Sequence, residues 1–216
     1  ENCFPEEMNA KELGVSFKYI FKNWESKVFA DYLKRFSVPT DKQVKEFSRG
    51  MKMKLAIAGA LSHGAKLLIL DEATSGLDPI VREQILDVLK ANDVKATFFI
   101  TAHYVNTQPE LVKRMINEGH IVGNHTVNHK SMPDCSLDTI KKEMMDLHSA
   151  IYEKFGYEMK YMRPPKGEYS ERTVAYTNTL GYTTVMWSFG YDDWDEKKQG
   201  REEYGKKKIL DNVHNG

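Results

Sequence analysis

The pattern of hydrophobic and polar positions differs between the first and the second part of the chain. In the second part, short runs of β-branched, aromatic and leucine residues predict buried strands. We place these strands at Leu67–Leu70, Lys95–Ile100, 120–124, 159–162 and Thr183–Trp187.

The longer segments between these runs have the three-to-four-residue periodicity of amphipathic helices. One helix finishes at Ile85–Leu89, and others are predicted over 108–118, 136–155 and 170–180. The alternation of strand, loop and helix favours parallel β/α units that close as a barrel or form an open sheet. The predicted fold class is therefore α/β.

The first 45 residues are polar and helix-prone instead. Their one short apolar face, with spacings of three and four, consists of Phe17, Ile20, Phe21 and Trp24. A turn is expected at Pro39 and Asp41. This pattern predicts small helices that pack on a larger body.

Composition limits the classes of protein that fit. The 216 residues suit one large α/β domain or two small ones, and 31 basic residues balance 31 acidic ones. A net charge of zero provides no overall field for nucleic acid, so no nucleic-acid partner is expected. No apolar run approaches the roughly 20 residues of a membrane span, and the first residues lack the features of a signal peptide. Two distant cysteines form no disulfide framework or zinc pattern.

The segment Gly123–His129 is the strongest candidate for chemistry. His125 and His129 are four residues apart, so on a helical turn both imidazoles would face one cation. They follow the predicted strand 120–124 at its carboxyl end, where α/β enzymes build their sites. This pattern predicts a divalent metal, most simply zinc, which needs a third protein ligand such as a carboxylate.

A second candidate belongs to nucleotide chemistry. Ser48 and Gly50 form a turn before a helix predicted over Lys52–Leu61, and a hydroxyl with free amides at a helix start can hold phosphate oxygens. An apolar strand then delivers Asp71 and Glu72. Such acids can bind magnesium and orient a water molecule.

Together these residues resemble the second half of an ATP-binding-cassette (ABC) ATPase. Phe47–Met51 is similar to the signature motif, Leu67–Glu72 to the Walker B strand and Ser75–Asp78 to the D-loop, and the resemblance covers about 1–89. A Gly-x-x-x-x-Gly-Lys-Ser/Thr loop, which would grip the phosphates, does not occur in the sequence. The resemblance therefore implies descent from a transporter subunit without implying ATP hydrolysis.

The rest of the chain, from about 85 to 216, resembles a NodB-homology polysaccharide deacetylase. Within that family it is similar to the peptidoglycan N-acetylmuramic acid deacetylases of muramic δ-lactam formation. The segments that support the resemblance stand in the family's order: Thr97–Thr101, His125-x-x-x-His129, Arg163–Arg172, Gly181–Trp187 and Asp193–Trp194.

The resemblance implies a mechanism and its residues. In the family, an Asp and two His hold a divalent metal, a second Asp acts as base, and a distant His protonates the leaving amine. His125 and His129 match the metal histidines, and Arg163 matches the residue that orients the base. The implied substrate is an amino-sugar polysaccharide such as peptidoglycan.

The same resemblance implies a substrate groove. Pro164, Pro165 and Tyr169 match the cleft wall, and Trp187 and Trp194 match its aromatic side. On their own, tryptophans are more often part of a core than a sugar platform.

Two family motifs are missing from the sequence. Neither the Thr-Phe-Asp-Asp-Gly motif, which supplies base and metal carboxylate, nor the closing Leu-Leu-His segment with the general acid occurs. In the family, the strand with the Asp-Asp motif leads through a loop into the helix that here ends at Ile85–Leu89. The strand Leu67–Leu70 is followed by two acids and leads into this same helix, so we hypothesise that Asp71 takes the base position and Glu72 the metal position. His103 can alternatively be compared with the switch His of ABC ATPases.

The sequence is interpreted as a fusion. Residues 1–66 form a helical segment resembling the ABC signature region, and 67–216 form an incomplete (β/α) deacetylase barrel of parallel strands. The expected function is metal-dependent N-deacetylation of amino sugars. The alternative is a fragment of a transporter ATPase that binds ATP. Deacetylase kinship suggests a location outside the membrane and ABC kinship a cytoplasmic one, so location is left open.

Overall fold

The computed structural model describes residues 4–65, 67–71 and 79–186. The chain divides into two compact units. The described residues are 4–65 in the first unit and 67–71 and 79–186 in the second. None of the described helices is both long and apolar enough to cross a membrane.

The first unit is helical, as its polar pattern predicts. It contains α1 (Ala10–Ile20), α2 (Ser26–Arg35), a short 3-10 helix η1 (Val44–Glu46) and α3 (Arg49–Leu61). Asn9 begins α1 with a capping box, because its side chain accepts from the backbone of Glu12 while the Glu12 carboxylate accepts from the backbone of Asn9.

An aromatic cluster holds these helices together. The ring of Phe17 lies 5.7 Å from that of Phe21, 5.1 Å from that of Trp24 and 6.1 Å from that of Phe29. Such tilted aromatic pairs add to the free energy of burial. Three of the four residues in the predicted apolar face therefore pack together, whereas Ile20 is 37% exposed.

The second unit is built on a parallel sheet in the order β1-β2-β3-β4-β5. Its strands are β1 (Leu67–Asp71), β2 (Lys95–Ile100), β3 (Ile121–Asn124), β4 (Tyr161–Met162) and β5 (Thr183–Thr184). Its helices are α4 (Pro79–Ala91), α5 (Ala102–Thr107), α6 (Pro109–Asn117), α7 (Leu137–Phe155) and α8 (Glu171–Thr179), with η2 at Pro165–Gly167.

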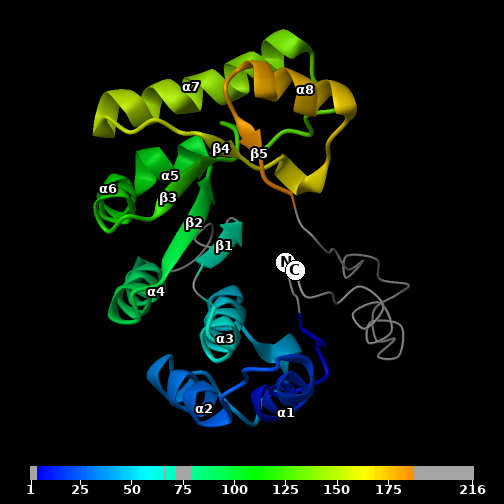
Figure 1. Ribbon diagram of the computed structural model, residues 1–216, viewed down its shortest axis with the longest axis vertical. Helices are drawn as coiled ribbons and strands as arrows, with labels where there is room; N and C mark the ends of the chain where they lie inside the picture. Colours follow the sequence, from blue (N-terminus) through cyan, green and yellow to red (C-terminus); the bar gives the residue numbers. More distant parts are fainter. Residues whose placement is uncertain (1–3, 66, 72–78, 187–216) are drawn as a thin grey trace. The chain divides into compact units, whose positions relative to one another are not determined.

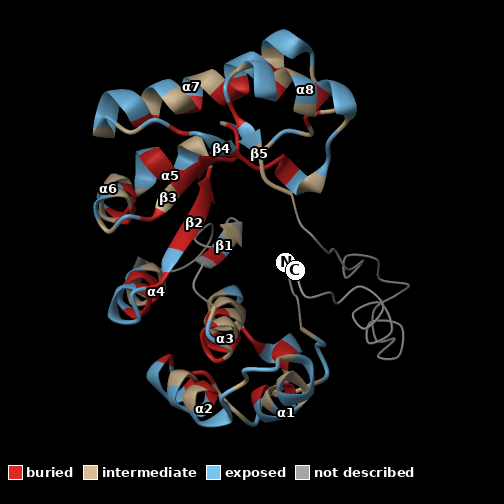
Figure 2. Ribbon diagram, in the orientation of Figure 1, coloured by how far each residue is buried: buried red, intermediate tan, exposed pale blue. Residues whose placement is uncertain are grey.

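Helices pack along this sheet and bury its central strands. α4 contacts β2, α6 and α7 contact β3, and α8 contacts β5 (Figure 1). The middle of β2 is buried on both faces, as expected of a parallel strand covered by helices (Figure 2). All five predicted strands are present in parallel register, so their carboxyl ends meet at one edge of the sheet.

Candidate metal centre at the carboxyl end of β3

The backbone at the end of β3 is fixed between its two neighbours. The N–H of His125 donates to the carbonyl oxygen of Ile100 at 3.0 Å, and the N–H of Arg163 donates to the carbonyl oxygen of Asn124 at 3.0 Å. His125 is therefore tied to the ends of both β2 and β4. Its side chain is buried, at 1% exposure.

The hydrogen bond of its ring determines the tautomer of His125. Nδ1 lies 2.8 Å from the carbonyl oxygen of Arg163, and a carbonyl oxygen only accepts, so Nδ1 bears the proton. When the ring is neutral, Nε2 therefore bears no proton. His129 Nε2 lies 3.1 Å from that atom, so the two ring nitrogens face each other. A backbone carbonyl on the other nitrogen is the usual orienting partner of metal-binding imidazoles.

The segment that joins the two histidines is not the helical turn predicted from their spacing. Thr126 has φ 66° and His129 has φ 55°, both in the left-handed region that side chains other than glycine seldom adopt. Two side chains hold this loop. Asn124 Oδ1 accepts from the Thr126 N–H at 2.9 Å, and Thr126 Oγ1 accepts from the His129 N–H at 3.0 Å. The prediction of a facing pair is confirmed, but by a different backbone path.

Glu143 on α7 is a supporting residue that the sequence reasoning missed. Its Oε2 accepts from the Asn128 backbone N–H and its Oε1 from Asn128 Nδ2, each at 2.7 Å. Its backbone oxygen accepts from the Val127 N–H at 3.1 Å, and Lys130 Nζ lies 3.2 Å from its Oε1. Burial alone would raise the pKa of Glu143, but the hydrogen bonds from Asn128 and Lys130 lower it. The side chain is therefore ionised and anchors the loop to α7.

A second support, also missed, extends from the side chain of Asn124. Its Nδ2 donates to the carbonyl oxygen of Met144 at 2.9 Å and to Tyr182 Oη at 3.0 Å. Tyr182 Oη in turn lies 2.7 Å from His148 Nδ1. Burial raises the pKa of Tyr182 to about 12, so its hydroxyl is protonated at neutral pH.

Arg163 is buried beside the pair, and a glycine makes its position possible. Its guanidinium lies 5.2 Å from the ring centre of Phe99, and its Nε and Nη2 are 3.4 Å from the carbonyl oxygens of Val185 and Met186. A Cβ at Gly123 would lie 2.5 Å from two ring atoms of Phe99. Glycine at 123 therefore allows Phe99 to lie under Arg163.

A third ligand is not found within 4–65, 67–71 and 79–186. In these ranges no group of three or more His, Cys, Asp and Glu side chains is placed to hold a metal ion. The backbone of Asp71 ends β1 opposite Phe99, which in turn pairs with Gly123. Asp71 is thus in the sheet row directly before Asn124. The Asp71 side chain and all of Glu72 lie outside the described residues.

The two imidazoles themselves fit a shared cation. Zinc binds imidazole nitrogen at about 2.0–2.1 Å in tetrahedral sites, which places two nitrogen ligands roughly 3.3 Å apart. The 3.1 Å between the Nε2 atoms of His125 and His129 is close to this value. A metal ion can bind at this pair only when both Nε2 atoms are without a proton.

The predicted substrate residues occupy different environments. Pro164 and Pro165 are buried, whereas Tyr169 is 57% exposed. A hollow of about 440 Å³ is lined by Ser131, Pro133, Asp134, Gly167, Glu168 and Tyr169. Tyr169 is thus one of several exposed residues in the Arg163–Arg172 segment, and it borders this hollow. Trp187 and Trp194 lie outside the described residues.

The residues predicted for nucleotide chemistry fall in both units. Ser48 caps α3 by accepting from the Met51 N–H at 3.3 Å, so the helix begins at Arg49 rather than at the predicted Lys52. Gly50 lies in the first turn of that helix. His103 is exposed on α5, a short helix that the sequence reasoning did not predict.

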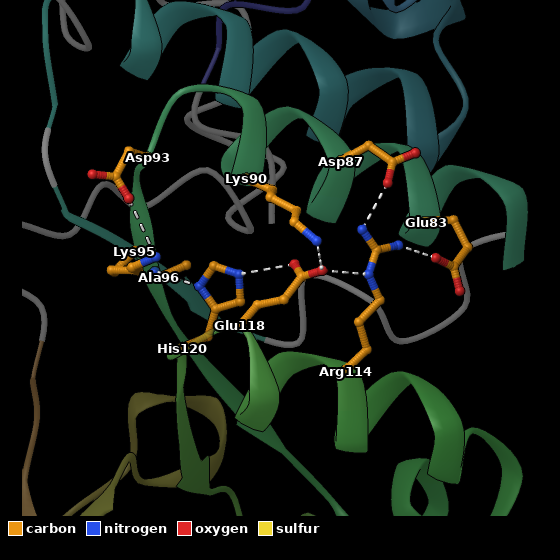
Figure 3. A network of polar contacts seen from close by, with 9 residues as sticks. All are labelled: Glu83, Asp87, Lys90, Asp93, Lys95, Ala96, Arg114, Glu118 and His120. Carbon is orange, nitrogen blue, oxygen red and sulfur yellow. Dashed lines mark hydrogen bonds and ion pairs between the residues drawn. The ribbon is translucent and has the colours of Figure 1, made fainter.

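A different polar cluster lies at the amino end of β3 (Figure 3). The Ala96 N–H donates to His120 Nδ1 at 3.1 Å, so this nitrogen bears no proton and Nε2 does. Nε2 points toward Glu118 Oε2, 3.9 Å away. Burial lowers the pKa of His120, the negative charge of Glu118 opposes this in part, and the positive charges of Lys95 and Arg114 lower the pKa further. His120 is thus a neutral core residue.

Arg114 joins this cluster to α4. It donates to Glu118 at 2.9 Å, to Asp87 at 2.6 Å and also to Glu83. Burial would lower its pKa, but these three carboxylates raise it. Lys90 completes the cluster at 3.3 Å from Glu118. The contacts here are pairs of opposite charge that connect α4, α6 and the start of β3.

Comparison with known proteins agrees with this geometry in the second unit. The polysaccharide deacetylase family model matches residues 67–185, and the ABC transporter model matches 2–75. A peptidoglycan-N-acetylmuramic acid deacetylase of Bacillus subtilis is 39% identical over 62% of this chain and 51% of its own length. A peptidoglycan-N-acetylglucosamine deacetylase of Bacillus cereus is 30% identical over 83% of this chain and 62% of its own length.

A solved structure extends the likeness to the fold. The family 4 carbohydrate esterase from Bacillus anthracis superposes with a TM-score of 0.53 at 34% identity, covering 69% of this chain and 78% of that one. The predicted class, an incomplete barrel of parallel strands preceded by a helical segment, is confirmed. The chain spans about half the length of the first curated relatives that it matches. It belongs to the polysaccharide deacetylase family.

Proposed function

We propose that this chain is a metal-dependent N-deacetylase of amino-sugar polysaccharides, with peptidoglycan as its substrate. The observation that carries the proposal is the facing pair of Nε2 atoms, 3.1 Å apart, on His125 and His129 at the carboxyl end of β3. The peptidoglycan deacetylases of Bacillus subtilis and Bacillus cereus support the substrate class.

In this proposal His125 and His129 hold a divalent ion, most simply zinc. When bound, such an ion polarises the acetamide carbonyl and lowers the pKa of a water molecule. The carbonyl oxygen of Arg163 keeps His125 in the tautomer with a bare Nε2. Asp71 and Glu72 supply the acidic groups, Asp71 as the base and Glu72 as the third ligand. The register of the sheet supports this role of Asp71, because Asp71 ends β1 opposite Phe99, near the carboxyl end of β2.

The groove contributes the remaining roles. Tyr169 presents an exposed phenol to a hollow beside the 165–169 turn, which suits contact with a sugar face. Arg163 orients the base carboxylate, and its burial over Phe99 restricts the motion of its guanidinium. Pro164 and Pro165 hold the turn, and Trp187 and Trp194 are the proposed aromatic side.

The test separates binding from catalysis. Metal-stripped protein is titrated with zinc by calorimetry, and acetate release from peptidoglycan and from chitin oligomers is measured afterwards. We expect zinc affinity to fall in Asp71→Ala and Glu72→Ala. Asp93→Ala is the matched control, because its carboxylate is exposed at the other end of the sheet. Unchanged affinity in both Asp71 and Glu72 variants removes these residues from the site, and absent zinc binding by the parent chain overturns the proposal.

We propose a second, separate origin for residues 1–66. The match of the ABC transporter model to 2–75 supports a fusion in which this segment descends from a transporter ATPase. The competing function, ATP binding through Ser48, Gly50, Asp71, Glu72 and His103, predicts that magnesium-ATP raises the melting temperature. A melting temperature that zinc raises and magnesium-ATP does not would leave only the deacetylase function.

A further inference from the structure

Four hydrogen bonds connect the outer side of α7 to the backbone of the second histidine. The first joins His148 Nδ1 to Tyr182 Oη at 2.7 Å, and the second joins Tyr182 Oη to Asn124 Nδ2 at 3.0 Å. The third and fourth run from Asn124 Oδ1 to Thr126 N at 2.9 Å and from Thr126 Oγ1 to His129 N at 3.0 Å.

Three of the four bonds in this chain have a direction fixed by chemistry, and the direction of the bond between Tyr182 and His148 depends on the His148 tautomer. Asn124 Nδ2 can only donate, so Tyr182 Oη accepts from it. Tyr182 can then donate its hydroxyl proton to His148 Nδ1 in the His148 tautomer that bears no proton on this nitrogen. Asn124 Oδ1 accepts from Thr126, so the amide of Asn124 has a single orientation that satisfies every partner. Rotating it by 180° would place a donor against the Thr126 N–H.

The loop that these bonds hold needs outside support. Thr126 and His129 both have positive φ, a conformation that costs free energy in residues other than glycine and persists only when neighbouring groups determine it. Asn124 is fully buried and Tyr182 is 2% exposed, so no solvent competes for their hydrogen bonds. His148 lies at the surface end, beside a hollow of about 270 Å³.

We propose that Tyr182 and His148 are positioning residues, which act through Asn124 to hold the loop and so set the separation of the two imidazoles. The proposal rests on the proposed function where it concerns metal binding, because it assigns the ion to His125 and His129. It assigns no contact with substrate to Tyr182 or His148.

The first measurement is the zinc dissociation constant, determined by calorimetry. We expect Tyr182→Phe and His148→Ala each to weaken binding about tenfold, the lower end of the range for residues that support metal ligands. His148→Asn should restore binding, because Asn Oδ1 takes the place of His Nδ1 as acceptor. The matched control is Tyr152→Phe, which removes an exposed hydroxyl from the same helix. Unchanged affinity in Tyr182→Phe would overturn the proposal.

The second measurement needs no metal. Amide hydrogen exchange in the stripped protein should rise about tenfold at Thr126 and His129 in Tyr182→Phe and His148→Ala, and stay unchanged at Phe98 in β2. Unchanged exchange at Thr126 and His129, or an equal rise at Phe98, would contradict a positioning role. If the parent chain binds no zinc, the proposed function fails while this exchange experiment still decides the inference.

Discussion

Two histidines flank the same short strand, one directly before β3 and one directly after it, and both are buried. His120 is 4% exposed and His125 is 1% exposed. At the amino end, His120 Nδ1 accepts from Ala96, so its proton is on Nε2 and faces Glu118. At the carboxyl end, His125 Nδ1 donates to Arg163, so its bare Nε2 faces His129.

The comparison shows that burial does not distinguish a core histidine from a candidate ligand. What distinguishes them is the group that faces Nδ1. In a neutral ring, an N–H that donates to Nδ1 leaves the proton on Nε2, whereas a carbonyl oxygen that accepts from Nδ1 leaves a lone pair on Nε2. The surroundings follow the same division. Fixed ion pairs surround His120, whereas a strained loop held by neutral and charged hydrogen bonds carries His129.

The largest effect that would sharpen this contrast comes from removing the carboxyl-end ring. We expect His125→Ala to weaken zinc binding at least 100-fold, or about 2.7 kcal/mol, because half of the imidazole ligands disappear. Titration calorimetry on metal-stripped protein measures it. His120→Ala is the counterpart with equal burial and should leave the affinity unchanged. A similar loss of affinity in both variants would erase the distinction between the two ends.

Next in size is the effect of a side chain in β3 itself. Gly123→Ala places a methyl group 2.5 Å from the ring of Phe99, so Phe99 and the Arg163 above it must move. We expect the free energy of unfolding to fall by about 2 kcal/mol, as for other overpacked cores. Urea denaturation gives this value. The control for backbone entropy is Ala96→Gly in β2, which exchanges the same two residue types in the neighbouring strand. Gly64→Ala is unsuitable as a control because Gly64 has positive φ.

Acid should destabilise the amino end. The pKa of His120 is lowered by burial relative to the ordinary 6.5, so the unfolded chain binds more protons than the folded one below that value. The contribution of neutral His120 to the free energy of unfolding is fully present above pH 6.5 and is lost as the pH falls through the folded pKa. We expect His120→Gln to flatten the slope of unfolding free energy against pH below 6.5. An unchanged slope would show that His120 does not titrate on unfolding.

The smallest expected effect concerns the ion pairs. Arg114→Ala removes contacts with Glu83, Asp87 and Glu118, whose side chains range from 13% to 61% exposed. Partly exposed pairs contribute about 1 kcal/mol or less, and salt screens them. We expect Arg114→Ala to lower the free energy of unfolding in 0.05 M salt and to lower it less in 1 M salt, as measured by urea denaturation. Zinc affinity should stay unchanged. A loss that does not depend on salt would point to packing by the arginine stem instead.

Much of the second unit could be predicted from periodicity. The strand Lys95–Ile100 is observed with the predicted bounds, and the helix predicted over 136–155 is observed as Leu137–Phe155. Both are long segments with a strong pattern, and Ser136 caps the helix by accepting from the Thr139 N–H. The short α5 was missed because six residues contain too few turns to establish a helical period.

The two candidate metal ligands could be predicted from the sequence, whereas the residues that support them could not. Spacing identified His125 and His129, but positive φ at Thr126 has no signal in the sequence, because a β-branched residue disfavours it. Glu143 did leave a signal. It falls on the buried face of α7 with Ile140, Met144 and Leu147, and an acid in an apolar stripe indicates a specific partner.

The opposite placement of the ring protons around β3 has a spectroscopic consequence. In a spectrum of ¹⁵N-labelled protein, His120 should show the pattern of the Nε2–H form and His125 that of the Nδ1–H form. His120, at the opposite end of the same strand, then serves as the reference for His125. An ion that binds at the carboxyl end should shift the ¹⁵N resonance of His125 Nε2 and leave both resonances of His120 where they were.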